Sequence, residues 1–255
     1  LDLLRKGFTF LNLKKYREAA EYFNQMLEIA PDNPEAWNNK GACLSHLDED
    51  DRAIECFEKA LELNPHYPEA WANKAAACVK LGKYDEALEC CDRSIEVNAD
   101  WAEAWSNKAI CLEHLGKYEQ ALECFDIATK KAPTYWGAWI NKANLLLQLN
   151  SFEEALKCCD EATRINQREP VLWKVKGDVL ARLSRYTESV DCYDRALQLD
   201  RKYVEALILK ADVMGRILKK TEEGLECLKI ALEFGAPEFI VFVMRGEILS
   251  AAGEY

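Results

Sequence analysis

Apolar side chains recur along this chain in pairs of short segments, and each pair repeats after 34 residues. We number every repeat so that Trp37 takes position 4 of its own repeat. Positions 4, 8 and 11 then hold apolar or small residues, at spacings that place them on one face of a helix. Position 4 is Leu3, Trp37, Trp71, Trp105, Trp139, Trp173, Leu207 and Phe242. The pattern predicts a helix at the start of each repeat.

A second helix is predicted after a short turn in each repeat. The turn reads Gly-Lys-Tyr at residues 82–84 and 116–118, and the segment after it carries Ala at position 20 in five repeats. Position 24 is Phe23, Phe57, Cys91, Phe125, Cys159 and Tyr193. Pro31, Pro65 and Pro133 follow the second segment, where Pro ends a helix. A fixed period of this length indicates helix pairs that stack on their neighbours.

These residues resemble the tetratricopeptide repeat (TPR) family, whose pattern places Trp, Gly, Tyr, Ala, Phe and Pro at these positions. The Asn-Lys-Gly/Ala that follows Trp is most similar to prokaryotic, especially archaeal, arrays. The resemblance implies an all-α fold, a right-handed α-solenoid of stacked antiparallel helix pairs, as a single array over residues 1–255. The predicted repeats are residues 1–33, 34–67, 68–101, 102–135, 136–169, 170–203 and 204–238, with the first helix of an eighth at 239–255.

The last two repeats depart from the pattern. The seventh has one extra residue between Ala211 and Ala231, and Gly224 stands where Ala is usual. Because Gly within a helix costs about 1 kcal/mol relative to Ala, we expect this repeat to be the loosest. The eighth begins with the apolar run 239–243, although terminal repeats usually need a polar face. We expect either a fragment of a longer array or self-association through residues 239–249.

Composition narrows the classes of partner. The chain has 33 basic and 44 acidic residues, which disfavours nucleic acid, and it has no apolar stretch long enough to span a bilayer. Of its eleven cysteines, six form one column, at Cys56, Cys90, Cys124, Cys158, Cys192 and Cys227. Stacked helices lie about 10 Å apart, whereas a disulfide needs Cα atoms within about 7 Å. These thiols are therefore predicted to pack as small apolar groups in a cytoplasmic protein.

The resemblance implies that positions 2, 5, 6, 9, 12 and 13 of each first helix face a concave groove. Position 6 is Asn in four successive repeats, and a carboxamide can both donate and accept a hydrogen bond to a peptide backbone. Position 2 carries Glu35, Glu69 and Glu103, which suit either a basic ligand or the helix dipole. The predicted groove residues are Asn39, Asn73, Asn107, Asn141, Glu35, Glu69, Glu103, Asn144, Lys174, Asp178, Arg182, Ile208 and Asp212.

The predicted groove changes along the chain. Positions 5 and 6 become Lys174 and Val175 in the sixth repeat, and Ile208 and Leu209 in the seventh. One end therefore reads as polar and the other as apolar, which predicts that an extended partner is held in one orientation. The Asn column can be read as a ligand-binding column or as ordinary repeat consensus. If it binds a ligand, we expect Asn107→Ala to weaken binding and to leave stability nearly unchanged.

Position 7 holds Lys in seven repeats and Arg245 in the eighth. A cation beside an apolar stripe needs a buried stem and a paired head, and we expect carboxylates of second helices as partners. The candidates are Asp92, Asp126, Asp160 and Asp194. Two Cys-x-x-His pairs, Cys43/His46 and Cys111/His114, supply only two ligands each, so no metal site is predicted.

No catalytic or phosphate-binding motif is present, and every polar cluster follows the repeat period. The sequence therefore predicts a cytoplasmic, non-catalytic scaffold without cofactors, which binds a protein or an extended peptide in its groove. If the position 2 glutamates face that ligand, we expect it to be basic. Neither nucleic acid nor membrane is expected as a partner. Two alternatives remain open: self-assembly through the apolar end, and service as the docking arm of an enzyme whose catalytic domain is absent.

Overall fold

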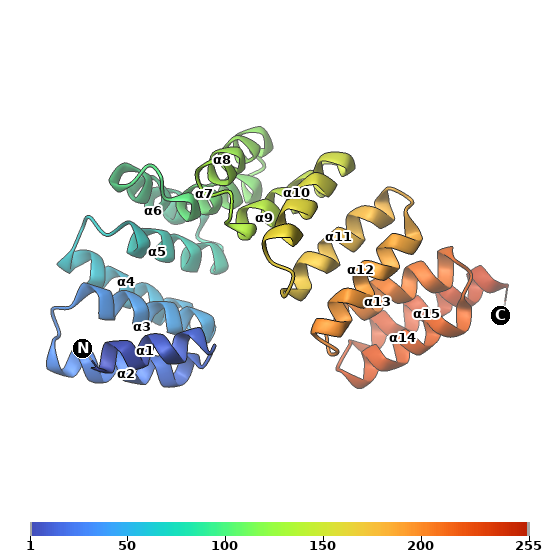
Figure 1. Ribbon diagram of the computed structural model, residues 1–255, viewed down its shortest axis with the longest axis horizontal. Coiled ribbons are helices and arrows are strands. Elements are labelled where there is room, and N and C mark those ends of the chain that lie inside the picture. Colours follow the sequence, from blue (N-terminus) through green and yellow to red (C-terminus); the bar gives the residue numbers. More distant parts are fainter. Residues whose placement is uncertain (1, 254–255) are drawn as a thin grey trace. The chain divides into compact units, whose positions relative to one another are not determined.

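The computed structural model describes residues 2–253, and every regular element in that range is helical. The helices gather into two compact units, an N-terminal unit of Leu1–Pro133 and a C-terminal unit of Thr134–Tyr255. Figure 1 shows the antiparallel helix pairs within each unit. The predicted all-α solenoid fold is confirmed. None of the helices between residues 2 and 253 has the length and apolar character that crossing a membrane requires.

The N-terminal unit contains four helix pairs. They are α1 (Asp2–Asn12) with α2 (Tyr16–Ile29), α3 (Pro34–His46) with α4 (Asp50–Leu63), α5 (Pro68–Lys80) with α6 (Tyr84–Val97), and α7 (Ala102–His114) with α8 (Tyr118–Lys131). Each first helix packs against its own second helix and against the second helix of the preceding repeat. The first helices also touch one another, α3 with α5 and α5 with α7.

The C-terminal unit contains three further pairs and a last helix. They are α9 (Trp136–Gln148) with α10 (Phe152–Ile165), α11 (Pro170–Arg182) with α12 (Tyr186–Leu199), α13 (Val204–Asp212) and η1 (Val213–Ile217) with α14 (Thr221–Glu233), and α15 (Glu238–Ala252). The first helices α3, α5, α9, α11 and α13 all begin within two residues of the predicted repeat boundaries. The predicted first helix of the eighth repeat, residues 239–255, corresponds to α15, and residues 254–255 of that range lie outside the described residues.

Local chemistry sets the ends of the helices. Pro occupies the first turn of α3, α5 and α11, where its missing N–H has no helical partner in any case. Ahead of α3, the side chain of Asn33 accepts a hydrogen bond from the N–H of Ala36 at 2.8 Å. The turn after the first helix needs a positive φ, which Gly82 supplies at 72° without steric cost.

The tryptophans at position 4 connect successive repeats. Each indole Nε1 donates to the backbone carbonyl six residues earlier, in the loop that enters its own first helix. The distances are 2.8 Å for Trp37, 2.9 Å for Trp71 and Trp105, and 3.1 Å for Trp173. A buried or half-buried indole usually needs such a partner, and the bond therefore accounts for Trp rather than Phe at this position.

The small residue at position 8 makes room for the aromatic residue at position 24 of the same repeat. A Cβ atom placed on Gly41 would lie 2.6 Å from Cε1 of Phe57, which is almost fully buried. Gly177 is filled in the same way by Tyr193. This Gly–aromatic contact is the centre of each helix pair that contains it.

The extra residue of the seventh repeat is absorbed by a π-helical turn at η1, directly after α13. Gly215 within this turn lies against Gly224 of α14. A Cβ atom on Gly224 would lie 2.9 Å from the backbone of Gly215 and 3.0 Å from the carbonyl oxygen of Ala211. The sequence suggested that Gly224 loosens this repeat, whereas the structure places it at a close helix contact that only Gly permits.

Candidate functional site: the first-helix face

The position 6 asparagines of the N-terminal unit connect its first helices. Asn73 Nδ2 on α5 donates to Asn38 Oδ1 on α3, and Asn107 Nδ2 on α7 donates to the carbonyl of Ala72 on α5, each at 3.0 Å. Asn39 instead donates to the carbonyl of Glu35 in its own helix at 2.7 Å. Each of these carboxamides thus already uses one of its two N–H groups within the helices. The structure gives this column a stacking role that the sequence did not reveal.

The oxygens of the same carboxamides are unused. Within the described residues, no hydrogen bond reaches Oδ1 of Asn39, Asn73 or Asn107, and all three side chains are half-buried. Each oxygen has lone pairs that can accept from an incoming N–H group. This column is therefore an acceptor of hydrogen bonds.

Tyr67 completes this face. It lies at the start of α5, and its hydroxyl accepts a long hydrogen bond of 3.5 Å from Asn38 Nδ2. Burial, Glu69 and Glu35 raise the pKa of the Tyr67 hydroxyl to about 12, so it stays protonated near neutral pH. Both carboxylates therefore lie near this hydroxyl. We call the set Glu35, Asn39, Tyr67, Glu69, Asn73, Glu103 and Asn107 the first-helix face.

Trp101 occupies the position in the fourth repeat's entry loop that Tyr67 holds one repeat earlier. Its indole Nε1 is buried without a hydrogen-bond partner among the described residues. The reason lies in the neighbouring position 5, where Asn38 faces Tyr67 but the apolar Ala72 takes its place in the next repeat. A buried donor without a partner is unfavourable and is satisfied by any acceptor that reaches it.

Charges on the predicted groove positions of the C-terminal unit are paired with one another. Lys174 lies 3.2 Å from Asp178 and 3.4 Å from Glu205, and the hydroxyl of Tyr193 donates to Asp178 at 2.8 Å. Burial raises the pKa of Asp178, although Lys174 and Tyr193 oppose that shift. This cluster is saturated by its own hydrogen bonds and ion pairs.

A second network follows one repeat later. Arg216 pairs with Asp212 and, at 2.8 Å, with Glu247 of α15. Val175 is buried, and Ile208 packs against the core. The C-terminal unit therefore presents a charged network where the sequence predicted an apolar stretch.

The remaining predicted groove residues have separate surroundings. Arg182 is exposed, donates to Asn150 at 3.1 Å and lies over the ring of Phe152. On α9, Asn141 is half-buried and Asn144 is exposed.

Three of the position 7 lysines pair with second-helix aspartates, as predicted. Lys108 lies 2.6 Å from Asp92, Lys176 lies 2.8 Å from Asp160, and Lys210 lies 2.6 Å from Asp194. Each pair connects a first helix to the second helix of the preceding repeat. Lys40 instead donates to the side-chain oxygen of Asn24 at 2.9 Å, so the predicted carboxylate is replaced there by an amide.

Models of the tetratricopeptide repeat match residues 34–67, 102–135 and 137–168, a second model matches 51–111 and a third 172–203. The chain belongs to the tetratricopeptide repeat family. The prenyltransferase alpha subunit repeat, another family model, matches residues 16–47. No curated protein sequence matches the chain.

Several solved structures share this fold at low sequence identity. A chain of the Cut9–Hcn1 hetero-tetramer of the APC/C gives a TM-score of 0.81 at 14% identity, covering 95% of this chain. The match spans 48% of that longer chain. PilF of Pseudomonas aeruginosa gives 0.70 at 17% identity, covering 84% of this chain and 97% of its own. YrrB, described as a TPR protein with an unusual peptide-binding site, gives 0.58 at 18%, covering 76% and 99%.

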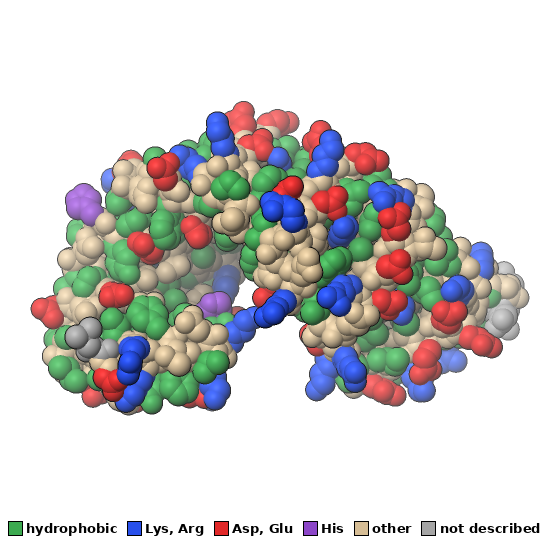
Figure 2. All heavy atoms as spheres, viewed as in Figure 1, with side chains coloured by type: hydrophobic (Ala, Val, Ile, Leu, Met, Phe, Trp, Pro, Cys, Tyr) green, Lys and Arg blue, Asp and Glu red, His purple; other side chains and the backbone are tan. Residues whose placement is uncertain are grey.

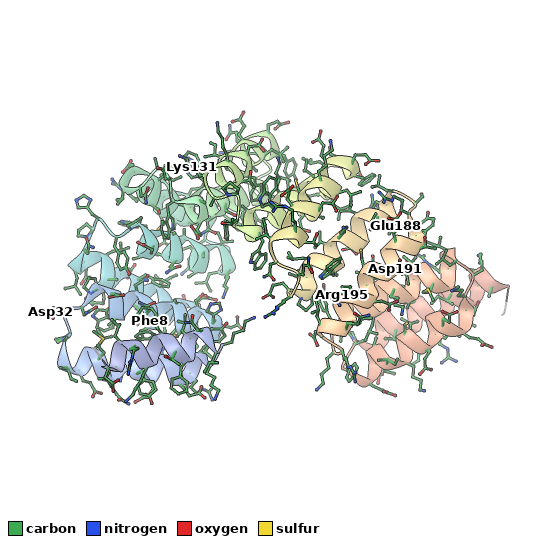
Figure 3. The ribbon with its side chains drawn as sticks, viewed as in Figure 1. Phe8, Asp32, Lys131, Glu188, Asp191 and Arg195 are labelled. Carbon is green, nitrogen blue, oxygen red and sulfur yellow. The ribbon has the colours of Figure 1, made fainter. Side chains whose placement is uncertain are left out.

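The TPR fold is that of a protein-interaction scaffold, generally without catalysis. The exposed charges agree with such a surface. Figure 2 shows acidic and basic side chains interspersed on the visible face of both units. Glu188, Asp191 and Arg195 of α12, labelled in Figure 3, are all exposed. Second helices of this TPR protein thus carry mixed charge on their solvent side.

The cysteine and histidine motifs have packing roles in the TPR fold. All eleven cysteines are buried, including the six of the predicted column. Burial raises the pKa of Cys43 to about 12, so its thiol is unreactive near neutral pH. His46 stacks on Tyr16 at 4.2 Å between ring centroids, and His114 stacks on Tyr84 at 4.5 Å. Among residues 2–253, no group of three or more metal-ligating side chains comes together.

Asn38, Tyr67 and Trp101 were missed by sequence reasoning. A signal existed for two of them, because the residue before the first helix is aromatic in four repeats, at Tyr67, Trp101, Tyr135 and Tyr203. Asn38 gave none, since position 5 is Leu, Ala, Ser, Ile, Lys or Val in the other repeats.

Proposed function

We propose that this TPR protein binds an extended, basic segment of a protein partner on the first-helix face of its N-terminal unit. The supporting observation is the chemistry of that face. One N–H of each carboxamide is used within the helices, while the carboxamide oxygens and the carboxylates of Glu35, Glu69 and Glu103 remain to accept. A surface in which acceptors outnumber donors selects a ligand rich in donors, namely backbone N–H groups with Lys or Arg side chains.

The spacing of the face suits an extended chain. The three asparagines recur once per repeat on first helices that touch one another, so their oxygens form a row across α3, α5 and α7. A peptide laid along this row meets an acceptor in each repeat whatever its side chains are. The neighbouring carboxylates then supply the preference for basic residues. The fold is shared with YrrB, a TPR protein described as having a peptide-binding site.

The test compares two triple variants on arrays of extended peptides that differ in Lys and Arg content. Glu35→Gln, Glu69→Gln and Glu103→Gln together remove three charges from the face and keep its shape. The matched control changes Glu55, Glu89 and Glu123 to Gln, which are exposed, equally spaced and carried by second helices.

We expect the wild type and the control to bind basic peptides, with affinity that falls as salt rises. The face variant is expected to bind the same peptides about tenfold or more weakly, since the carboxylates face the ligand. Equal weakening by both triple variants would reduce the preference to net charge and refute the site. If neither triple variant binds basic peptides more weakly than the wild type, the proposal of a basic ligand is refuted.

A further inference from the structure

The last helix, α15, leaves an unfilled slot that is occupied in other repeats. Gly7, Gly41 and Gly177 hold position 8 of their repeats, and a Cβ atom on each would lie within 2.7 Å of an aromatic ring, that of Phe23, Phe57 or Tyr193. Gly246 is the position 8 residue of α15, and no described atom lies within 4 Å of the point where its Cβ would be. The slot at Gly246 therefore has the shape that receives an aromatic ring elsewhere in this chain.

The slot belongs to an apolar surface. A cavity of about 410 Å³ lies between α14 and α15, lined by Leu225, Leu228, Leu232, Val241 and Phe242, with charged residues at its rim. The two helices pack side by side at the C-terminal end of the chain (Figure 1). Phe239 is 78% exposed and Phe242 is 60% exposed, whereas large apolar side chains are normally covered.

The charges of the rim indicate what the occupant carries. In the third repeat, Lys74 pairs with Glu58 of the preceding second helix at 2.9 Å and with Glu86 of its own second helix at 3.2 Å. At the equivalent place on α15 stands Arg245, and Lys229 takes the position of Glu58. Arg245 has no ion pair with any described residue, and Lys229 already pairs with Glu226 at 3.4 Å. Arg245 thus lacks the carboxylate that a covering helix supplies in the third repeat.

We propose that α14 and α15 bind an amphipathic helix of a protein partner. That helix carries an acidic residue, a small residue directly after it and an aromatic residue four positions further on. The acidic residue pairs with Arg245, the small residue permits close approach, and the aromatic ring fills the slot at Gly246. The aromatic contact is the one that Phe23 of α2 makes at Gly7, and the acidic contact is the one that Glu86 makes with Lys74. In α2 the same three positions are Glu18, Ala19 and Phe23. This helix mode of recognition is separate from the extended ligand on the first-helix face.

The probe is a labelled peptide with the sequence of residues 16–29, added to the full chain and followed by fluorescence polarisation. A helix of this length is marginal in water, so a staple joins the positions of Arg17 and Glu21, which are exposed in α2. We expect saturable binding. Changing the peptide residue that corresponds to Phe23 to Ala should weaken binding by about tenfold or more, since it removes the anchoring ring.

Two protein variants locate the site. Gly246→Leu fills the slot and should abolish binding, whereas Glu233→Leu adds the same side chain at an exposed position of α14 outside the cavity and should not. Arg245→Glu should weaken the probe and recover affinity for a peptide in which the Glu18 position is Lys. Circular dichroism of each variant shows whether its helices are retained, and the charge exchange remains informative if Gly246→Leu misfolds.

Three results would overturn the proposal. The first is equal binding to the wild type and to folded Gly246→Leu, and the second is absence of binding by the probe. The third is a dimer in light scattering that Gly246→Leu dissociates, because the surface would then be covered by a second copy. The triple Gln variant of Glu35, Glu69 and Glu103 should bind this probe like the wild type. The helix-binding proposal can therefore be tested even if the proposal of a basic-peptide site fails.

Discussion

At the scale of single residues, the carboxamides of the N-terminal unit combine a stacking contact with the proposed ligand contact, one at each end. Nδ2 of Asn73 and Asn107 ties one first helix to the preceding one, while Oδ1 stays free of bonds from described residues. If the proposed site is right, a change at these residues affects stability and ligand binding together. The expectation that Asn107→Ala leaves stability unchanged needs revision for this reason.

Asn107→Ala should lower the free energy of unfolding by about 1 kcal/mol, because the carbonyl of Ala72 loses a part-buried hydrogen bond between repeats. Asn39→Ala is the matched control, since Asn39 donates only to Glu35 of its own helix. We expect a change of less than about 0.5 kcal/mol there. Urea unfolding measures both, and equal destabilisation by the two variants would contradict the stacking role of Asn107.

Asp178 should make stability depend on pH. Burial raises its pKa in the folded protein above the unfolded value, so its stabilising contribution is complete below the unfolded pKa of about 3.9. That contribution is lost as pH rises through the folded pKa, because the carboxylate must then be buried charged. Asp178→Asn removes this charge but retains an oxygen that can accept the hydrogen bond from the hydroxyl of Tyr193. Lys174 retains its ion pair with Glu205 in that variant.

The melting temperature of the wild type should therefore fall relative to that of Asp178→Asn as pH rises from about 4 to 7. Differential scanning calorimetry of both proteins across that range measures the difference. A constant difference between the two proteins would mean that Lys174 and Tyr193 offset the effect of burial on Asp178.

At the scale of helices, two glycines of the C-terminal unit differ in the space around them. Gly224 lies against the backbone of Gly215 and Ala211, so an added Cβ has no space to enter. Gly246 lies on the open side of α15. Gly224→Ala should destabilise the protein by about 1–3 kcal/mol despite the better helix propensity of Ala. Gly246→Ala should stabilise it by up to about 1 kcal/mol.

Thermal unfolding of these two variants is a direct comparison, since the chemical change is identical. A stabilising Gly224→Ala would show that α14 and η1 can move apart. In that case the expectation from sequence, that the seventh repeat is the loosest, would stand.

The helices and their pairing could be read from the sequence because both depend on local periodicity. The ion pairs of Lys108, Lys176 and Lys210 were also predictable, since one spacing repeats through the array. The bond from Asn107 to Ala72 could not be predicted, because it depends on how far neighbouring first helices are offset. The π-helical turn at η1 was equally hidden, as an extra residue can be absorbed in a loop or a helix.

At the scale of the whole molecule, a solenoid has no single centre, because each repeat contacts only its neighbours. Trp105→Ala removes a large side chain and its bond to the carbonyl of Ala99, and should cost about 3–5 kcal/mol. Hydrogen exchange should rise in α5 to α8 and remain unchanged in α13 to α15. Uniform acceleration over all helices would instead show that the chain unfolds as one cooperative block.

The hydrogen bonds from tryptophan to the loop carbonyls should make tryptophan fluorescence sensitive to the opening of these loops. Trp37, Trp71, Trp105 and Trp173 have nearly the same surroundings, each with its indole N–H held by one backbone oxygen. Their emission should therefore be nearly identical while the loops are closed and shift to longer wavelength as each opens to water. During partial unfolding, the fraction of shifted light from these four of the seven tryptophans should rise with the number of loops that have opened.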